Sequence, residues 1–343
     1  MKVVILFGGK STEYEVSCMS AASVIKYIKN HEIIKIGITK DGKWYKTNAD
    51  YNSIDSGDWV NLSDNCPVML SLTEKAFIYD NEVLYPDIVF PVLHGKNGED
   101  GTIQGLLEIA GIPYVGCRVL SSALCMDKVY AKAVCAQAGI KQLPYIFINR
   151  SDYIKNREAF VNKAEASLTY PIFVKPSNAG SSIGISKCEA RSELIPAIDK
   201  AFKHDRRVLL ETGVIDPDEV EVSVLGNDDP VASVSGRIIP SNDFYDYEAK
   251  YISNQSELKI PSGSEAEEEI RKIAVEAYKA CDCRGLARVD FLLDKNGGIY
   301  LNELNTIPGF TSISMYSKLF DASGIGYPEL INKLIGFGLE FND

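Results

Sequence analysis

The sequence lacks any hydrophobic run long enough to cross a membrane. A membrane-spanning helix needs ~18 to 20 apolar residues, and no stretch approaches that length. The apolar run at residues 3–7 is also shorter than the ~7 to 15 residues of a signal-peptide core, and it leads directly into two glycines. We therefore interpret this run as a buried first strand and predict a soluble, cytoplasmic protein with no membrane partner.

Cysteine motifs of the zinc-binding kind are also missing. The chain has eight cysteines, but no C-x-x-C pair is followed by a second pair at zinc spacing. They lie at positions 18, 66, 117, 125, 135, 188, 281 and 283. We expect small buried or half-buried thiols in a reducing compartment, with no assigned role.

Positive charge is in the minority, with 36 Lys and Arg residues against 47 Asp and Glu residues and a net charge of −11. Such a surface repels nucleic acid and anionic membranes, so we predict no nucleic-acid partner. A phosphate-bearing substrate would need its own local cluster of lysines. The 343 residues, 45% of them apolar, suffice for two or three domains with large cores.

Short apolar runs alternate with helical patterns along the chain, which is typical of an α/β protein with largely parallel sheets. Residues 3–7 and 88–93 are buried-strand patterns, and residues 16–28 form a helical pattern between them. Ligands of open α/β sheets bind at the carboxyl ends of the strands, so the turns after these two strands are candidate sites. Further strands are predicted at 33–38, 145–148, 171–176, 208–211, 220–225, 287–293 and 299–305, helices near 128 and at 266–280, and an insertion or hairpin at 45–85.

Residues 175–184 carry a lysine from a predicted strand into a loop of small residues. Glycine lets the backbone approach a phosphate, amide and hydroxyl groups donate to its oxygens, and Lys175 supplies positive charge. The order of residues is not that of a Walker A loop. The segment predicts a phosphate site, although a surface turn has the same composition.

Two neighbouring predicted strands carry Arg288, Asp290, Glu303 and Asn305. Residues two apart on a strand share a face, so these side chains converge on one face of a hairpin. Oxygen ligands beside an anionic substrate suit Mg²⁺. The loop that follows contains Gly309, whose amide can stabilise a developing negative oxygen together with Arg288.

Taken together, the motifs resemble those of the D-alanine:D-alanine ligases, members of the ATP-grasp superfamily, and the resemblance runs almost from end to end. It rests on seven segments in family order: 8–13, 94–101, 126–128, 175–184, 244–251, 288–290 and 302–311. It implies an α/β protein that is α+β in its ATP-grasp part. An N-terminal open parallel-sheet, Rossmann-like domain at 1–119 would precede two ATP-grasp subdomains at 120–211 and 212–343.

The resemblance also implies the substrates and the metal. ATP and D-alanine would react through a D-alanyl phosphate, and two Mg²⁺ or Mn²⁺ ions would be held by Asp290, Glu303 and Asn305. The residues implied to bind ATP are Lys128, Lys175, Ser182, Glu211, Val214, Glu219 and Lys250. Glu211 and Val214 would meet the adenine and Glu219 the ribose, while Lys250 would lie near the γ-phosphate.

For the amino-acid sites the resemblance implies that Glu13 binds the ammonium of the first D-alanine and orients Ser181. Ser181 would in turn contact Tyr251, which belongs to a loop that closes over the reactants. The remaining implied site residues are His94 near the first substrate, Arg288 and Gly309 as the oxyanion site, and Ser314 and Met315 for the carboxylate of the second D-alanine. A homodimer is also implied.

The acceptor is the open question, because residues 90–101 and 120–128 also resemble those of the vancomycin-resistance ligases, some of which use D-serine. An apolar pocket rejects an added hydroxyl only ~10²-fold at best, and Met315 offers that hydroxyl little, so we favour D-alanine. A catalytically silent ATP-binding protein is the alternative from another class. The retained acidic and basic side chains argue against it.

Overall fold

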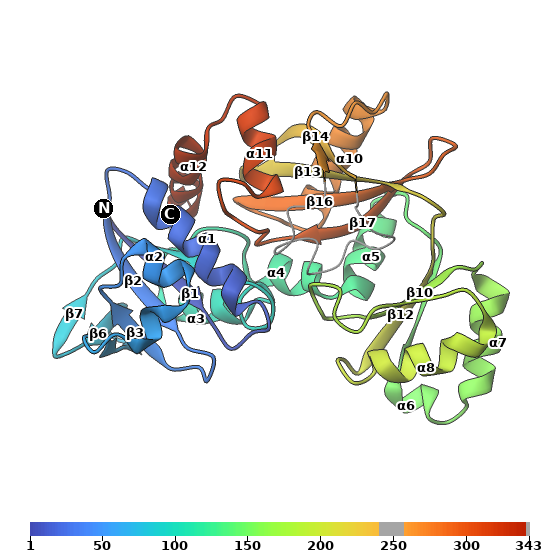
Figure 1. The fold of residues 1–343 in the computed structure, drawn as a ribbon, viewed down its shortest axis with the longest axis horizontal. Coiled ribbons are helices and arrows are strands. Elements are labelled where there is room, and N and C mark those ends of the chain that lie inside the picture. The colour runs from blue at the N-terminus through green and yellow to red at the C-terminus, as the bar shows by residue number, and fades with distance from the viewer. Residues whose placement is uncertain (240–256, 341–343) are drawn as a thin grey trace.

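The structure is a computed structural model that describes residues 1–239 and 257–340. Its N-terminal part is a five-stranded sheet with strand order β4-β3-β2-β1-β8, of which β1, β2 and β3 are labelled in Figure 1. The strands are β1 Lys2–Gly8, β2 Glu32–Ile38, β3 Trp44–Thr47, β4 Cys66–Pro67 and β8 Ile88–Val92, and the helices are α1 Tyr14–Tyr27 and α3 Thr102–Ala110. The apolar side chains of β1 are fully buried, as expected for a central parallel strand covered on both faces.

The region predicted as an insertion or hairpin is an appendage to this sheet. It contains a separate three-stranded antiparallel sheet of β5 Met69–Ser71, β6 Ala76–Tyr79 and β7 Glu82–Leu84. Helix α2 Tyr51–Asp55 and a 3₁₀ turn, η1 Asp58–Asn61, precede it. Trp59 of this turn is fully buried against Phe7, so the appendage is anchored to the main core.

The central part is a four-stranded antiparallel sheet with order β11-β10-β12-β9. Its strands are β9 Tyr145–Asn149, β10 Ile172–Pro176, β11 Ser186–Cys188 and β12 Arg207–Thr212. Helices α6 Arg150–Tyr153, α7 Arg157–Ser167 and α8 Arg191–Ala201 lie beside it (Figure 1). Their buried side chains share a single core with the strands.

The C-terminal part is a five-stranded antiparallel sheet with order β15-β14-β13-β16-β17. Its elements are β13 Asp218–Leu225, β14 Val231–Ile239, β15 Glu257–Lys259, α10 Glu267–Ala280, β16 Leu286–Leu293, β17 Ile299–Asn305 and α11 Met315–Ala322. Helices α4 Val119–Met126 and α5 Lys128–Gln137 lie in the middle of the molecule (Figure 1).

The fold class implied by the resemblance is confirmed: the N-terminal sheet pairs β1 in parallel with β2 and β8, and the rest of the described chain is α+β with antiparallel sheets. The pattern-based prediction of largely parallel sheets along the whole chain is wrong outside the N-terminal part. The physical reason is that a short buried apolar run has the same appearance in a parallel and in an antiparallel sheet. The strand positions themselves are confirmed.

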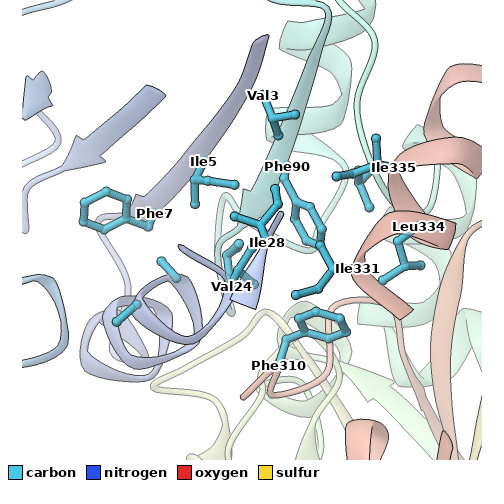
Figure 2. Close-up of a cluster of buried hydrophobic side chains, with 14 of the residues drawn as sticks. Val3, Ile5, Phe7, Val24, Ile28, Phe90, Phe310, Ile331, Leu334 and Ile335 are labelled. Carbon is cyan, nitrogen blue, oxygen red and sulfur yellow. The ribbon is translucent and has the colours of Figure 1, made fainter. Parts of the chain in front are cut away.

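The last helix, α12 Tyr327–Leu339, returns to the N-terminal sheet. Figure 2 shows Ile331, Leu334 and Ile335 of this helix facing the side chains of β1 and Phe90 of β8. No helix in the described part of the chain combines the length and apolarity needed to span a bilayer.

Candidate active site

A cavity of about 1230 Å³ lies where the three parts of the chain meet. Its walls come from the turns after β1 and β8, the loop after β10, the strand ends of β12 and β13, and the β16–β17 hairpin. The cavity therefore gathers the turns that the sequence singled out as candidate sites.

At one end of the cavity the Ser181 hydroxyl donates a hydrogen bond to the Glu13 carboxylate, across 168 residues of sequence. Glu13 is buried and lies at the start of α1, after the β1 turn. Its carboxylate is closely surrounded by backbone, because a Cβ on Gly95 would overlap with Glu13 Oε2 and one on Gly180 would lie 3.3 Å from Glu13 Oε1. Three loops from different parts of the chain thus position this one carboxylate.

His94 follows β8 and is buried at the same end. Its Nε2 lies 3.2 Å from Ser20 Oγ, and its Nδ1 lies 2.9 Å from the Ile307 carbonyl oxygen. Burial lowers the pKa of His94 to about 4, so the ring is neutral at pH 7. Nδ1 is then the protonated nitrogen, since a carbonyl oxygen can only accept.

Glu99 is a second acid near Glu13 and is half-buried. Burial and the Glu13 charge raise the pKa of Glu99 to about 8, so this side chain is largely protonated at pH 7. Its Oε1 accepts a hydrogen bond from the Gly95 amide at 3.0 Å. Glu99 therefore adds little negative charge to this end of the cavity.

The middle of the cavity is dominated by a buried charge cluster. The Glu211 carboxylate forms ion pairs with Lys175 and, at 2.9 Å, with Lys132. Burial opposes the charge on Glu211, but the two ammonium groups outweigh it and lower its pKa to about 2. Burial likewise opposes the charge on Lys175, and the Glu211 carboxylate reverses this and raises the pKa of Lys175. Glu303 and Glu219 also act on Lys175, so lysines and acids are gathered together at this point of the site.

Lys128 connects the helical middle of the molecule to the C-terminal hairpin. Its ammonium lies 3.3 Å from Glu303 Oε2 and donates to the Ala179 carbonyl oxygen at 2.9 Å. The preceding residue, Asp127, caps α5 and accepts from Arg207 at 3.1 Å. The start of α5 is therefore fixed to both neighbouring sheets.

Arg288, Glu303 and Asn305 line the far wall, and they belong to a charged cluster that extends across three strands. Asp290 of β16 lies opposite Glu221 of β13 on one side and Glu303 of β17 on the other. Arg288 contacts both Asp290, at 2.7 Å, and Glu221, at 3.0 Å, and Asn305 Nδ2 donates to Asp290 Oδ2 at 3.0 Å. The convergence predicted for these strands is confirmed.

The metal part of that prediction stays a prediction. Arg288 pairs with both Asp290 and Glu221, and Lys128 pairs with Glu303, so these contacts offset only part of the acidic charge. Within residues 1–239 and 257–340, no three His, Cys, Asp or Glu side chains are arranged to hold a metal ion. The carboxylates of Asp290 and Glu303 and the amide oxygen of Asn305 are hard oxygen ligands. They fit Mg²⁺, whose remaining coordination positions water and phosphate would fill.

Most predicted site residues meet at this cavity. Its lining includes Glu13, His94, Lys128, Lys175, Ser181, Ser182, Glu211, Val214, Glu219, Arg288, Glu303, Asn305 and Gly309. Asp290 lies behind Arg288 and does not line it. Lys250 and Tyr251 lie outside the described residues.

Ser314 and Met315 are not among the cavity-lining residues. Ser314 precedes α11 and accepts a hydrogen bond from the Thr311 amide at 3.0 Å. Met315 packs in a small apolar cluster with Ile238 and Leu319. The structure thus places these two residues at the start of a helix just beyond the Gly309 loop.

Sequence reasoning missed Lys132, Glu99 and Glu221. Lys132 lies one helical turn after Lys128 on α5 and is buried, so the i, i+4 spacing of two lysines was an available signal. Glu99 lies within the segment 94–101, for which the sequence predicted no role of this residue. Glu221 gave no signal, because its partner Arg288 is 67 residues away and the pairing depends on the sheet order.

Family models and sequence relatives of this chain all carry the name of one kind of ligase. Residues 2–117 match the family model described as D-ala D-ala ligase N-terminus, and residues 134–336 match the one described as D-ala D-ala ligase C-terminus. The chain is 50% identical to the D-alanine–D-alanine ligase of Acetivibrio thermocellus, with 100% of this chain and 97% of that protein covered. It is also 50% identical to the ligase of the same name from Caldicellulosiruptor bescii, with 100% and 96% covered.

Two solved structures are also similar. The VanG D-Ala:D-Ser ligase from Enterococcus faecalis has a TM-score of 0.90 at 44% identity, covering 98% of this chain and 99% of that one. The D-alanine-D-alanine ligase from Coxiella burnetii has a TM-score of 0.86 at 31% identity, covering 100% and 96%.

Proposed function

The chain belongs to the D-alanine–D-alanine ligase family, and we propose that it joins two D-alanine molecules at the expense of ATP for peptidoglycan precursors. The observation that carries the proposal is the cavity itself. One end presents a buried carboxylate oriented by a serine, and the rest presents lysine side chains beside a set of oxygen ligands. An amino acid and a nucleotide triphosphate would fit side by side in this arrangement.

The nucleotide would occupy the side of the cavity between the central and C-terminal sheets. Lys128, Lys175 and the Ser182 loop would contact its phosphates, and Val214 and Glu219 its adenosine end. All five residues line the cavity. The ammonium groups of Lys128 and Lys175, which line the cavity, suit a polyphosphate, since charges interact strongly when water is excluded. The Glu211 side chain is held by the two lysines, so a contact with adenine would come from its backbone.

Magnesium would be held by Glu303, Asp290 and Asn305, and when bound there it would neutralise the phosphate oxygens and orient them for transfer. For this to happen Lys128 would exchange Glu303 for a phosphate oxygen, and Asp290 would share its carboxylate with Arg288. Lys250 would assist near the γ-phosphate.

Glu13 would bind the ammonium group of the first D-alanine, whose carboxylate then attacks the γ-phosphate to give an acyl phosphate. The amine of the second D-alanine would displace phosphate from this intermediate. Arg288 and the Gly309 amide face the same cavity and would stabilise the negative oxygen of the tetrahedral intermediate. Neutral His94 adds no positive charge that would compete with the substrate ammonium for Glu13. Ser314 and Met315 would bind the second carboxylate at the start of α11, and Tyr251 would close the site.

A D-alanine:D-serine ligase is the second candidate, favoured by the similarity to the VanG enzyme. The chemistry of the first half-reaction is the same in both. We favour D-alanine as acceptor because the curated relatives that match at 50% identity are D-alanine–D-alanine ligases and because Met315 packs in an apolar cluster.

The test is phosphate release by the purified protein with ATP, Mg²⁺ and D-alanine. We expect release that depends on D-alanine and matches the amount of dipeptide formed. Release no greater than that seen without amino acid would overturn the proposal.

We also propose that the enzyme acts in the cytoplasm as a homodimer. Sedimentation at micromolar concentration would test the dimer by showing twice the 37.8 kDa chain mass.

A further inference from the structure

Five of the eight cysteines gather in one place inside the molecule. They come from the loop before α4, from α4, from α5, from the end of α10 and from the loop before β16, and all are buried. These residues are Cys117, Cys125, Cys135, Cys281 and Cys283. Two pairs of sulfur atoms are in contact, Cys125 with Cys283 at 3.8 Å and Cys135 with Cys281 at 3.7 Å.

The two pairs differ in access. Cys125 lines the cavity of the candidate active site, next to Met126, which lines it as well. Cys135 and Cys281 are fully buried and do not line it. A small polar oxidant that enters the cavity can therefore reach Cys125 without unfolding the protein, and it cannot reach the second pair.

We propose that Cys125 and Cys283 form a reactive dithiol site that a hydroperoxide entering through the cavity oxidises to a disulfide. The two residues are 158 positions apart and tie α4 to the loop that precedes β16. This bond would join the middle of the molecule to the sheet that carries Asp290 and Glu303.

The chemistry balances with the peroxide as oxidant. The Cys125 thiolate attacks one peroxide oxygen, the O–O bond breaks, and Cys125 becomes a sulfenic acid while hydroxide leaves. The Cys283 sulfur then attacks the Cys125 sulfur, the S–O bond breaks, and the oxygen leaves as water with the Cys283 proton. The hydroxide takes up the proton that Cys125 had released, so two thiols and one hydrogen peroxide give one disulfide and two waters.

The surroundings assign the attacking and resolving roles. Hydrogen bonds with the Cys281 and Cys283 thiols lower the pKa of Cys125 to about 6, whereas the contacts of Cys283 with Cys117 and Cys125 raise the pKa of Cys283. The thiolate is the nucleophile, so the thiol with the lowered pKa and the access is the one that reacts first. Within the described residues the sulfur atoms do not form a metal-binding arrangement, which favours pairwise oxidation over metal ligation.

Oxidation would change the nucleotide site, and this consequence rests on the function proposed above. The sulfur atoms must close from 3.8 Å to about 2.05 Å, which draws the end of α4 toward Cys283. Lys128 begins the next helix, only three residues after Cys125, and contacts Glu303. Since a displacement of about 1 Å at a reacting group can cost ~10²-fold in rate, we expect the KM for ATP to rise about tenfold or more.

The experiment treats the wild-type protein, Cys283→Ser and Cys66→Ser with hydrogen peroxide. Cys66 is half-exposed and outside the cluster, so Cys66→Ser is the matched control. Non-reducing peptide mapping should find a Cys125–Cys283 link in the wild type and in Cys66→Ser, reversed by dithiothreitol together with the change in KM. Cys283→Ser should keep its basal activity and form no link.

Peptide mapping keeps this test separate from the function, because the disulfide can be identified whether or not the protein is a ligase. A map without the Cys125–Cys283 link, or with Cys135–Cys281 oxidised first, would overturn the proposal. A link that forms while the KM for ATP stays unchanged would overturn its consequence for the nucleotide site.

Discussion

At the scale of single residues, the Glu211 carboxylate is the most consequential buried charge of the cavity. It is 2% exposed and is the shared counter-ion of Lys132 and Lys175. Removing one member of a buried ionic group leaves the others uncompensated in a medium that solvates them poorly. The identity of this single acid should therefore control both stability and the charge available to the nucleotide.

We predict that Glu211→Gln lowers the free energy of unfolding at pH 7 by about 3–5 kcal/mol, the range for a broken buried pair. The folded-state pKa of Glu211 lies below its ordinary value of 4.5. Its stabilising contribution is therefore present above pH 4.5 and is lost as the pH falls from there toward 2. Urea unfolding between pH 7 and pH 3 measures both effects.

Glu158→Gln is the matched control for this measurement, because Glu158 pairs with Arg191 on the exposed surface. Exposed ion pairs contribute little to stability. Equal losses from Glu158→Gln and Glu211→Gln would contradict the role given to the buried cluster.

A second residue-scale prediction concerns Glu303. Glu303→Ala should reduce phosphate release by about 10³-fold or more, because a metal ligand that stabilises several kcal/mol of transition-state charge is lost. The fold should remain, since Lys128 keeps its second contact with the Ala179 carbonyl oxygen. Steady-state kinetics measure the rate of phosphate release, and urea unfolding measures the stability of the fold. Glu329→Ala, on the exposed side of α12, is the control. A rate near that of the wild type would refute the metal assignment.

At the scale of elements, the Glu13 carboxylate is held by loops rather than by its own helix. Gly95 follows β8 with φ +71°, and a side chain there would overlap with Glu13 Oε2. The loop after β10 approaches from the other side and delivers Ser181. A single carboxylate is thus sensitive to changes in two separate loops.

We predict that Gly95→Ala displaces Glu13 and raises the KM for the first D-alanine by about 10- to 10²-fold, as expected for a misplacement near 1 Å. Gly139→Ala is the control, because Gly139 also has a positive φ, +79°, but its Cβ would meet no atom within 4 Å. Both variants carry the same backbone strain, so the comparison isolates the contact. Similar KM values for the two variants would contradict the proposed packing.

Sequence patterns predicted the positions of the elements better than their partners. The strands at 3–7, 88–93 and 299–305 were predicted because buried apolar runs are visible locally. The local patterns did not give strand direction in the central and C-terminal sheets, apart from the hairpin at 287–305, because direction is decided by pairings between distant segments. The convergence of Arg288, Asp290 and Asn305 was predictable from strand alternation, whereas the Lys132–Glu211 pair joins a helix to a strand that only the fold brings together.

At the scale of the whole molecule, the last described helix packs against the first sheet of the chain. Helix α12 packs on the N-terminal sheet, and its Tyr327 hydroxyl donates to the Phe310 carbonyl oxygen at 2.8 Å. The Phe310 amide in turn donates to Ser20 of α1 at 3.2 Å. The loop that contains Gly309 is therefore fixed by the first and the last helices together.

Leu334→Ala should lower the free energy of unfolding by about 2–5 kcal/mol, the usual range for a fully buried leucine that leaves a cavity. Leu120→Ala is the control, since Leu120 is 62% exposed on another helix and should change stability by no more than about 0.5 kcal/mol. Chemical denaturation measures both. A Leu334→Ala protein as stable as the control would show that α12 does not stabilise the N-terminal core.

The central claim, ligation of two D-alanine molecules, is tested most directly by the product made from a mixture. The enzyme is given ATP, Mg²⁺ and equal concentrations of D-alanine and D-serine at neutral pH, and the dipeptides are quantified by mass spectrometry. We predict that D-alanyl-D-alanine predominates and that its amount equals the phosphate released. A predominance of D-alanyl-D-serine, or phosphate release without dipeptide, would contradict the account.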